Sequence, residues 1–155
     1  MPFSRRPAGQ NPLLITIIKR DGHKQRLCRA VSRIWDTPEF LIKEDVRSAI
    51  GHLIEHSLLG YKIHPDIMII DLETCSLDAA AQFDTVRSIS GLRNVPVIAL
   101  VDMASADVRD MIYDAGADLV VAWENLESRI GDIAGLAVDN WLNTDPFEDE
   151  ELQTG

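Results

Sequence analysis

The chain has 155 residues and a formal net charge of -10; 46% of its residues are hydrophobic and 26% are charged. This balance is typical of one globular domain with an ordinary core, and the acidic charge disfavours nucleic acid as the main partner. We expect no membrane span and no signal peptide, because no apolar run is long enough for either. Cys28 and Cys75 lie far apart, which fits a reducing cytoplasm without a structural disulfide.

The charge is unevenly distributed along the chain. Residues 1–35 hold eight Lys or Arg and one acid, whereas the remainder holds seven basic residues and 24 acids. The basic part either binds an acidic protein surface or forms a solvated helix face that offsets the acidic remainder. We expect a flexible segment at 1–12, a folded domain at 13–142 and an acidic tail at 143–155.

Strands and helices are predicted to alternate. In chain order, the pattern predicts a strand at 13–18, a helix at 23–35, a strand at 39–44, a helix at 45–59, a strand at 66–71, a helix at 78–90, a strand at 94–101, a helix at 105–117, a strand at 118–123 and a helix at 125–142. Asp45 and Ser105 are predicted helix N-caps, and Gly116 is a predicted helix stop. The helix at 45–59 places apolar residues on one side: Val46, Ile50, Leu53, Ile54 and Leu58.

Several of these strands are unbroken apolar runs, such as Ile67 to Ile70. Continuous apolar strands indicate a parallel sheet that helices cover on both faces. In such α/β sheets the functional crevice lies beyond the carboxyl ends of the strands. Asp71 ends one of these strands, and three roles fit it: a metal ligand, a nucleophile toward phosphoryl groups, or a cap for the following loop.

From about Leu13 to Leu142 the chain resembles the receiver domain of bacterial response regulators. The resemblance rests on "HPDIMIIDLETCSLDA", "VPVIALV" and "YDAGADLVVAW". The end "NLESRIGDIAGLAVDNWL" is similar to single-domain regulators that partner bacterial phytochromes. The resemblance implies a flavodoxin-like (βα)5 fold, a doubly wound five-stranded parallel sheet of order 2-1-3-4-5. It also implies that Asp71 occupies the position that takes a phosphoryl group from a histidine kinase.

The chain departs from the receiver pattern around that position. The family's acidic pair, which holds Mg²⁺, falls on Lys19 and Arg20, and Asp21 is the one acid left in that loop. The family's Thr or Ser falls on Val101, which Asp102 follows, and its Lys falls on Trp123. In the loop after Asp71, the usual Pro falls on Cys75, while Asp78 keeps its residue type.

These departures predict that Asp71 forms an ion pair with Lys19 or Arg20. Mg²⁺ requires hard oxygen ligands, which neither cation offers, so we expect no Mg²⁺ cofactor and lost or impaired phosphorylation. Asp21 and Asp71 remain weak candidates for a cation site. Asp102 would contribute a further carboxylate from the neighbouring strand end, which is a less typical arrangement. Trp123 either plugs the pocket or is a large apolar residue at a loop edge.

We therefore predict an atypical receiver, or pseudo-receiver, that acts in two-component phosphorelay signalling by protein contacts and is not an enzyme. Its expected partner is a sensor histidine kinase or another signalling protein. A homodimer is expected through the fourth helix, fifth strand and fifth helix, which offer Met111, Ile112, Val120, Ile130, Ile133 and Leu136. Two alternatives remain open: an active phospho-acceptor that uses Asp71, and a small-molecule-binding or enzymatic domain. His52 and His56 share helical spacing but lack a third metal ligand.

Overall fold

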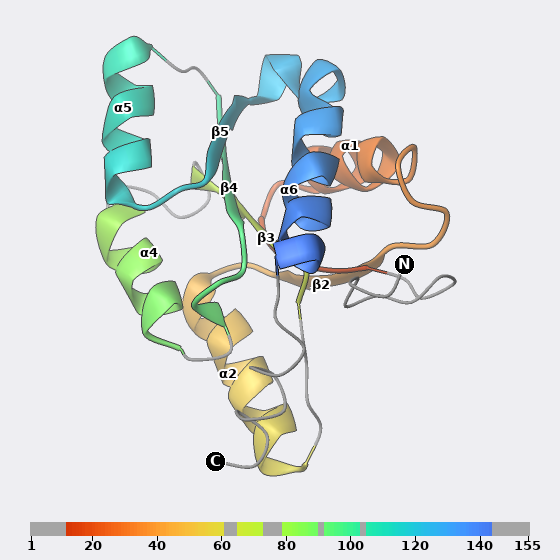
Figure 1. The fold of residues 1–155 in the computed structure, drawn as a ribbon, viewed down its shortest axis with the longest axis vertical. Coiled ribbons are helices and arrows are strands. Elements are labelled where there is room, and N and C mark those ends of the chain that lie inside the picture. Colours follow the sequence, from red (N-terminus) through yellow and green to blue (C-terminus); the bar gives the residue numbers. More distant parts are fainter. Residues whose placement is uncertain (1–11, 61–64, 73–78, 90–91, 103–104, 144–155) are drawn as a thin grey trace.

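The computed structural model describes residues 12–60, 65–72, 79–89, 92–102 and 105–143. Within these ranges the strands are β1 (Leu13–Ile17), β2 (Glu39–Lys43), β3 (Ile67–Asp71), β4 (Val97–Val101) and β5 (Leu119–Ala122). The helices are α1 (Asp21–Val31), α2 (Val46–Leu58), α4 (Ala79–Ser88), α5 (Ala106–Ala115) and α6 (Ile130–Asn143). All strand pairs are parallel, in the order β2-β1-β3-β4-β5, which confirms the predicted fold class (Figure 1).

Helices cover both faces of the sheet. On one face, side chains of the strands pack with α2, α4 and α5, and Phe83 and Ile112 are buried there. On the other face they pack with α1 and α6, where Leu27 and Ile133 are buried (Figure 1). Strands β3 and β4 are buried along their whole length, as the continuous apolar runs predicted. No described helix is long and apolar enough to cross a membrane.

The predicted helix caps are confirmed. The Asp45 carboxylate accepts a hydrogen bond from the Ser48 amide at 2.7 Å, and the Ser105 hydroxyl accepts one from the Val108 amide at 3.3 Å. Gly116 ends α5 with a φ of 124°, a conformation that residues with a Cβ rarely adopt.

The largest differences from the predicted helix boundaries are at the end of α1 and at the start of α6. Helix α1 runs from Asp21 to Val31, whereas the prediction extended it to Trp35. Trp35 follows a turn but still packs against the core, so its position in the sequence matched the helical spacing. Helix α6 begins only at Ile130, after two short 3-10 turns at 123–125 and 127–129. Most of the predicted terminal segments, residues 1–11 and 144–155, lies outside the described residues.

The predicted apolar side of α2 changes from buried to exposed along the helix. Val46 and Ile50 are buried against the sheet, as expected. Ile54 and Leu58, which were predicted on the same apolar side, are exposed. The helical period shows only which residues share a face, whereas burial requires that a neighbouring element covers the whole length of that face.

Candidate functional site

The carboxyl ends of β1, β3, β4 and β5 meet at one edge of the sheet. The strand register pairs Asp71 with Leu100 and Val101 with Ala122. Asp102 and Trp123, one residue beyond β4 and β5, therefore reach the same edge as Asp71. Arg20 lies in the loop after β1, in an extended conformation just before α1. Sequence reasoning had assigned these residues to the pocket, and the structure brings them together.

Arg20 and Asp71 form an ion pair at the centre of this edge. The Arg20 Nη2 donates to Asp71 Oδ1 at 2.9 Å and to Oδ2 at 3.0 Å, and the Arg20 Nε donates to Oδ2 at 3.2 Å. The Asp71 side chain is 1% exposed and that of Arg20 is 34% exposed. The predicted pairing of Asp71 with a cation of the first loop is confirmed, and Arg20 is that cation.

Asp102 binds the outer side of the same guanidinium. The Arg20 Nη1 donates to Asp102 Oδ2 at 3.1 Å, so one arginine joins the ends of β1, β3 and β4. Burial acts to lower the pKa of Arg20, but the hydrogen bonds and charges of Asp71 and Asp102 outweigh it and raise that pKa. Arg20 is therefore a permanent cation in this pocket.

Trp123 closes the pocket from the β5 side. Its side chain is buried, and its indole Nε1 donates to Asp71 Oδ1 at 3.2 Å. The Cζ atoms of Arg20 and Arg26 each lie 5.9 Å from the indole centroid, within the range of cation–π attraction. The His23 ring meets the indole edge-on at 4.2 Å between centroids. Of the two predicted roles of Trp123, this placement favours the one in which it plugs the pocket.

A second ion pair supports Trp123, and sequence reasoning missed it. Arg26 donates to Glu127 through Nε and Nη2, both at 2.7 Å. This pair joins α1 to the turns between β5 and α6. Its partners are 101 positions apart, so no local pattern in the sequence signals it.

Glu127 gives this pair a defined pH dependence. Hydrogen bonds from Arg26 lower the pKa of Glu127 from 4.5 to about 2. A carboxyl group whose pKa is lowered by folding stabilises the fold at pH values above its unfolded-state pKa. This stabilisation is lost as the pH falls from about 4.5 to about 2. We expect Glu127→Gln to lose at most about 1 kcal/mol of unfolding free energy at pH 7, since both side chains are over one-third exposed. Urea unfolding should show the difference from wild type shrinking below pH 4.5; a difference that persists at pH 2 would contradict this assignment.

The pocket does not fit a divalent cation as it stands. Both oxygens of Asp71 accept hydrogen bonds from Arg20, and Asp21 lies 3.4 Å from the Lys24 ammonium with its side chain largely exposed. The described residues contain no group of three or more His, Cys, Asp or Glu side chains that could hold a metal ion. Mg²⁺ requires an octahedron of oxygens, and here a guanidinium occupies the carboxylate it would need.

Two other predicted site residues, Lys19 and Val101, lie within the described part of the chain. Lys19 is exposed, and its charge acts on Asp45, whose pKa is lowered first by the Ser48 amide and in part by Lys19. Val101 is buried at the end of β4 and supplies no hydroxyl group to the pocket. Asp78 and Cys75 lie outside the described residues.

The residues of the predicted dimer face differ in how far their side chains are buried. Three of them are buried in the core and are not available to a partner: Ile112, Val120 and Ile133. Ile130 and Leu136 are partly buried against the core, and Met111 is exposed. The backbone amide of Val120, on the edge strand β5, donates to the Tyr113 hydroxyl at 3.1 Å.

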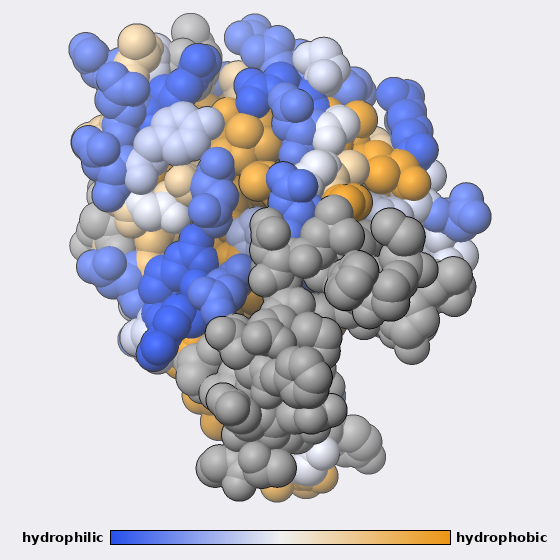
Figure 2. Space-filling view, in the orientation of Figure 1, coloured by the Kyte–Doolittle hydropathy of each residue, from blue (hydrophilic) through white to orange (hydrophobic). Residues whose placement is uncertain are grey.

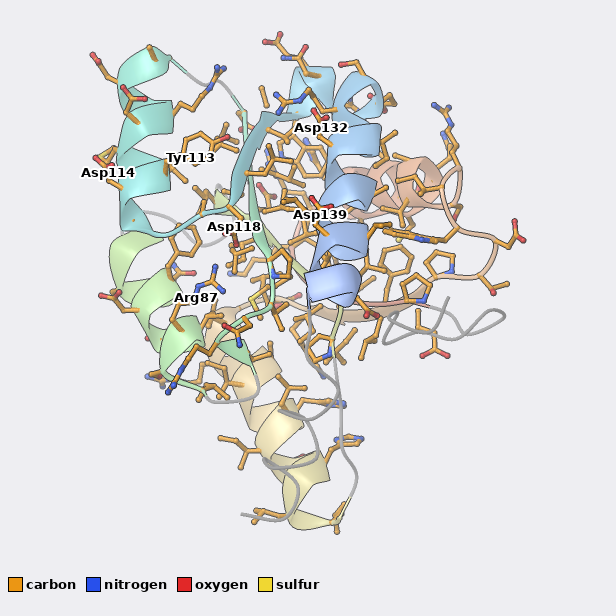
Figure 3. The ribbon with its side chains drawn as sticks, in the orientation of Figure 1. Arg87, Tyr113, Asp114, Asp118, Asp132 and Asp139 are labelled. Atoms are coloured by element: carbon orange, nitrogen blue, oxygen red, sulfur yellow. The ribbon has the colours of Figure 1, made fainter. Side chains whose placement is uncertain are left out.

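A second charged cluster lies at the opposite edge of the sheet (Figure 3). Arg87 donates to Asp118 at 2.8 Å and to the carbonyl of Val95 at 2.7 Å, and Asp118 accepts the Val97 amide at 2.8 Å. These bonds hold the amino ends of β4 and β5 together. They border an open hollow of about 360 Å³ that also reaches Leu136 and Asp139. Arg87 and Asp118 satisfy each other's polar groups and those of the nearby backbone. We therefore assign them a structural role.

Comparisons with known proteins agree with this architecture. No protein-family model matches the chain, and no curated protein matches its sequence. Solved structures do match. A response regulator in red light signaling of R. palustris is 20% identical, with a TM-score of 0.65 over 86% of this chain and 96% of that one.

Two further matches have similar values. A putative response regulator from Chloroflexus aurantiacus is 14% identical, with a TM-score of 0.68 over 83% of this chain and 98% of that one. The phosphorylated cyanobacterial phytochrome response regulator RcpA is 17% identical, with a TM-score of 0.64 over 88% of this chain and 97% of that one. The chain therefore has the fold of response regulator receivers.

Proposed function

We propose that this protein is a pseudo-receiver of two-component signalling, whose phospho-acceptor position is held in a permanent ion pair. The single observation that carries this proposal is the three-bond contact between Arg20 and the buried Asp71. A phospho-acceptor carboxylate must present a free oxygen to the phosphorus atom. Here both oxygens of Asp71 accept hydrogen bonds, and Oδ1 also accepts the Trp123 indole.

The charge balance of the pocket supports the same proposal. Phosphoryl transfer requires cations that neutralise the oxygens of the phosphoryl group as it moves. The charge of Arg20 is already shared between Asp71 and Asp102. Val101 supplies no hydroxyl group that would bind a transferred phosphoryl oxygen, and Trp123 supplies no charge.

The proposed output is protein contact. A receiver whose acceptor is permanently paired keeps one arrangement at the carboxyl edge of the sheet, since no phosphoryl group arrives to change it. A partner would then recognise the surface in this fixed state. The expected partners are a sensor histidine kinase or another signalling protein.

Treatment with acetyl phosphate and Mg²⁺ tests this proposal. The intact mass of the protein, quenched in acid, should show no phosphoryl adduct, and Asp71→Asn should give the same result. Circular dichroism before treatment confirms that the sample is folded. An adduct on the wild type that is absent from Asp71→Asn would refute the proposal and favour the active phospho-acceptor.

A further inference from the structure

The second half of α2 stands apart from the rest of the described fold. Ile54, Leu58 and Leu59 are exposed, although all three are large apolar residues. In Figure 1 this end of the helix extends beyond the sheet and the other helices, and Figure 2 shows hydrophobic atoms at that lower tip. A short helical segment is marginally stable without tertiary packing. Interactions within the helix itself are therefore important for the order of its last turns.

Two histidines lie one helical turn apart on this half of α2. The rings of His52 and His56 are stacked, with 4.1 Å between their centroids and an angle of 29° between their planes. Both residues are half-buried, whereas Ile54 and Glu55 between them are exposed. Residues four positions apart lie one above the other on the same helix face. The helix therefore holds two imidazoles side by side.

The hydrogen bonding of His56 suits this ring to binding a metal ion. The Nδ1 atom of His56 lies 3.0 Å from the backbone carbonyl oxygen of His52. A carbonyl oxygen only accepts hydrogen bonds, so Nδ1 carries the proton of the neutral ring and Nε2 carries the lone pair. Histidines that bind metal ions usually donate their other ring N–H to a carbonyl, a carboxylate or water. The backbone of α2 supplies this second interaction.

The charges around His52 oppose each other in their effect on a cation. Burial and the charges of His56 and Lys43 lower the pKa of His52, whereas Glu55 acts to raise it. A lowered pKa keeps the ring in the neutral form that binds metal ions. Lys43 would repel a bound cation and Glu55 would attract it, so the two charges largely offset each other.

We propose that His52 and His56 together bind a divalent transition-metal ion of the Zn²⁺ or Ni²⁺ type, which links two successive turns of α2. Imidazole nitrogens are well suited to these ions. Two imidazoles on one tetrahedral Zn²⁺ have their nitrogens about 3.3 Å apart. The stacked rings of this pair are close to that separation. Water molecules would complete the coordination of the ion.

The ion would also stabilise the exposed end of α2. When this end of the helix unfolds, the two imidazoles are no longer held one above the other, so the ion binds the helical form more tightly. A ligand that prefers one form shifts the equilibrium toward that form. Bound zinc should therefore slow the local opening of the last turns of α2. The site shares no residue with the Asp71 pocket, so this inference does not depend on the proposed function.

Calorimetric titration of the full, untagged chain with Zn²⁺ tests the inference, together with amide hydrogen exchange followed by mass spectrometry. Four proteins are compared: wild type, His52→Gln, His56→Gln, and His23→Gln as the matched control on α1. We expect each substitution on α2 to weaken zinc binding at least tenfold, and His23→Gln to leave the dissociation constant unchanged. Zinc should slow exchange at residues 54–59 several-fold in the wild type and not in the two α2 variants. Mn²⁺, which binds such ligands least tightly, should not slow it.

Three results would overturn the inference. A wild type that binds no zinc at millimolar concentration shows that the two histidines do not form a site. Zinc that binds the wild type and both α2 variants equally well lies elsewhere on the chain. Zinc that binds through the pair without slowing exchange at residues 54–59 does not stabilise the helix end. Glutamine is a good helix former, so both α2 variants should keep the metal-free melting temperature of the wild type. The mass test of Asp71 is a separate measurement, so the two proposals fail independently.

Discussion

We expect Arg20→Ala to lower the free energy of unfolding by about 2–3 kcal/mol. The substitution removes three hydrogen bonds and one positive charge from the buried Asp71 carboxylate, which keeps the bond from the Trp123 indole. Removing one partner of a fully buried ion pair costs about 3–5 kcal/mol, because the other charge remains desolvated and unpaired. The expected loss is smaller here because the Arg20 side chain is 34% exposed, which lets water approach the vacated position.

Urea denaturation measures this loss, and two variants serve as controls. Arg29→Ala removes an exposed arginine from the same region, α1, and should change the stability by about 0.5 kcal/mol or less. Arg20→Ala combined with Asp71→Asn also removes the buried negative charge that has lost its arginine in the single variant. It should therefore be more stable than Arg20→Ala alone. If Arg20→Ala unfolds at the same urea concentration as wild type, the ion pair does not stabilise the fold.

The second large effect is a gain of metal binding. We expect Lys19→Asp combined with Arg20→Asp to bind Mn²⁺ with a dissociation constant on the order of 10⁻³ M or tighter. The two substitutions replace the guanidinium on Asp71 with carboxylates and remove the neighbouring ammonium. Without metal, the facing carboxylates repel each other, so a divalent cation should also restore stability to this variant.

Melting temperature against Mn²⁺ concentration is the measurement. At ten times the dissociation constant, binding contributes about 1.4 kcal/mol, which corresponds to about 3–5 °C in a domain of this size. The wild type should show no shift, because Arg20 occupies Asp71. Adding Asp71→Asn to the double variant should abolish the shift. A double variant that melts at the same temperature with and without Mn²⁺ would show that Arg20 and Lys19 are not what keeps metal from this pocket.

Both predictions follow from one feature of this fold, the position of the Arg20 guanidinium. An internal guanidinium stands where the family pattern implies a metal ion, and it brings its own hydrogen-bond geometry. A metal ion exchanges with solvent and leaves room for a phosphoryl group, whereas Arg20 is covalently part of the chain and binds both oxygens of Asp71. This difference is the physical basis of the proposed function, in which the pocket provides stability and a fixed surface.

Local patterns in the sequence predicted a parallel sheet covered by helices on both faces, and the resemblance to receivers supplied the strand order. The apolar runs that became β3 and β4 identified buried parallel strands, because a strand covered on both faces has no polar alternation. Asp45, Ser105 and Gly116 identified helix ends, because capping depends on residues only a few positions apart. The resemblance to receivers then placed a cation next to Asp71.

Only the tertiary structure decided the contacts that give the pocket its character. Lys19 and Arg20 are adjacent in the sequence, but it is Arg20 that donates three hydrogen bonds to Asp71, whereas the Lys19 side chain is exposed. The Trp123 indole meets Asp71 from 52 positions away, a distance over which no local pattern operates. The sequence period likewise placed Leu58 on the apolar side of α2, although the sheet covers only the first turns of that helix. Residue spacing determines which side chains share a face, whereas packing between distant elements determines what that face touches.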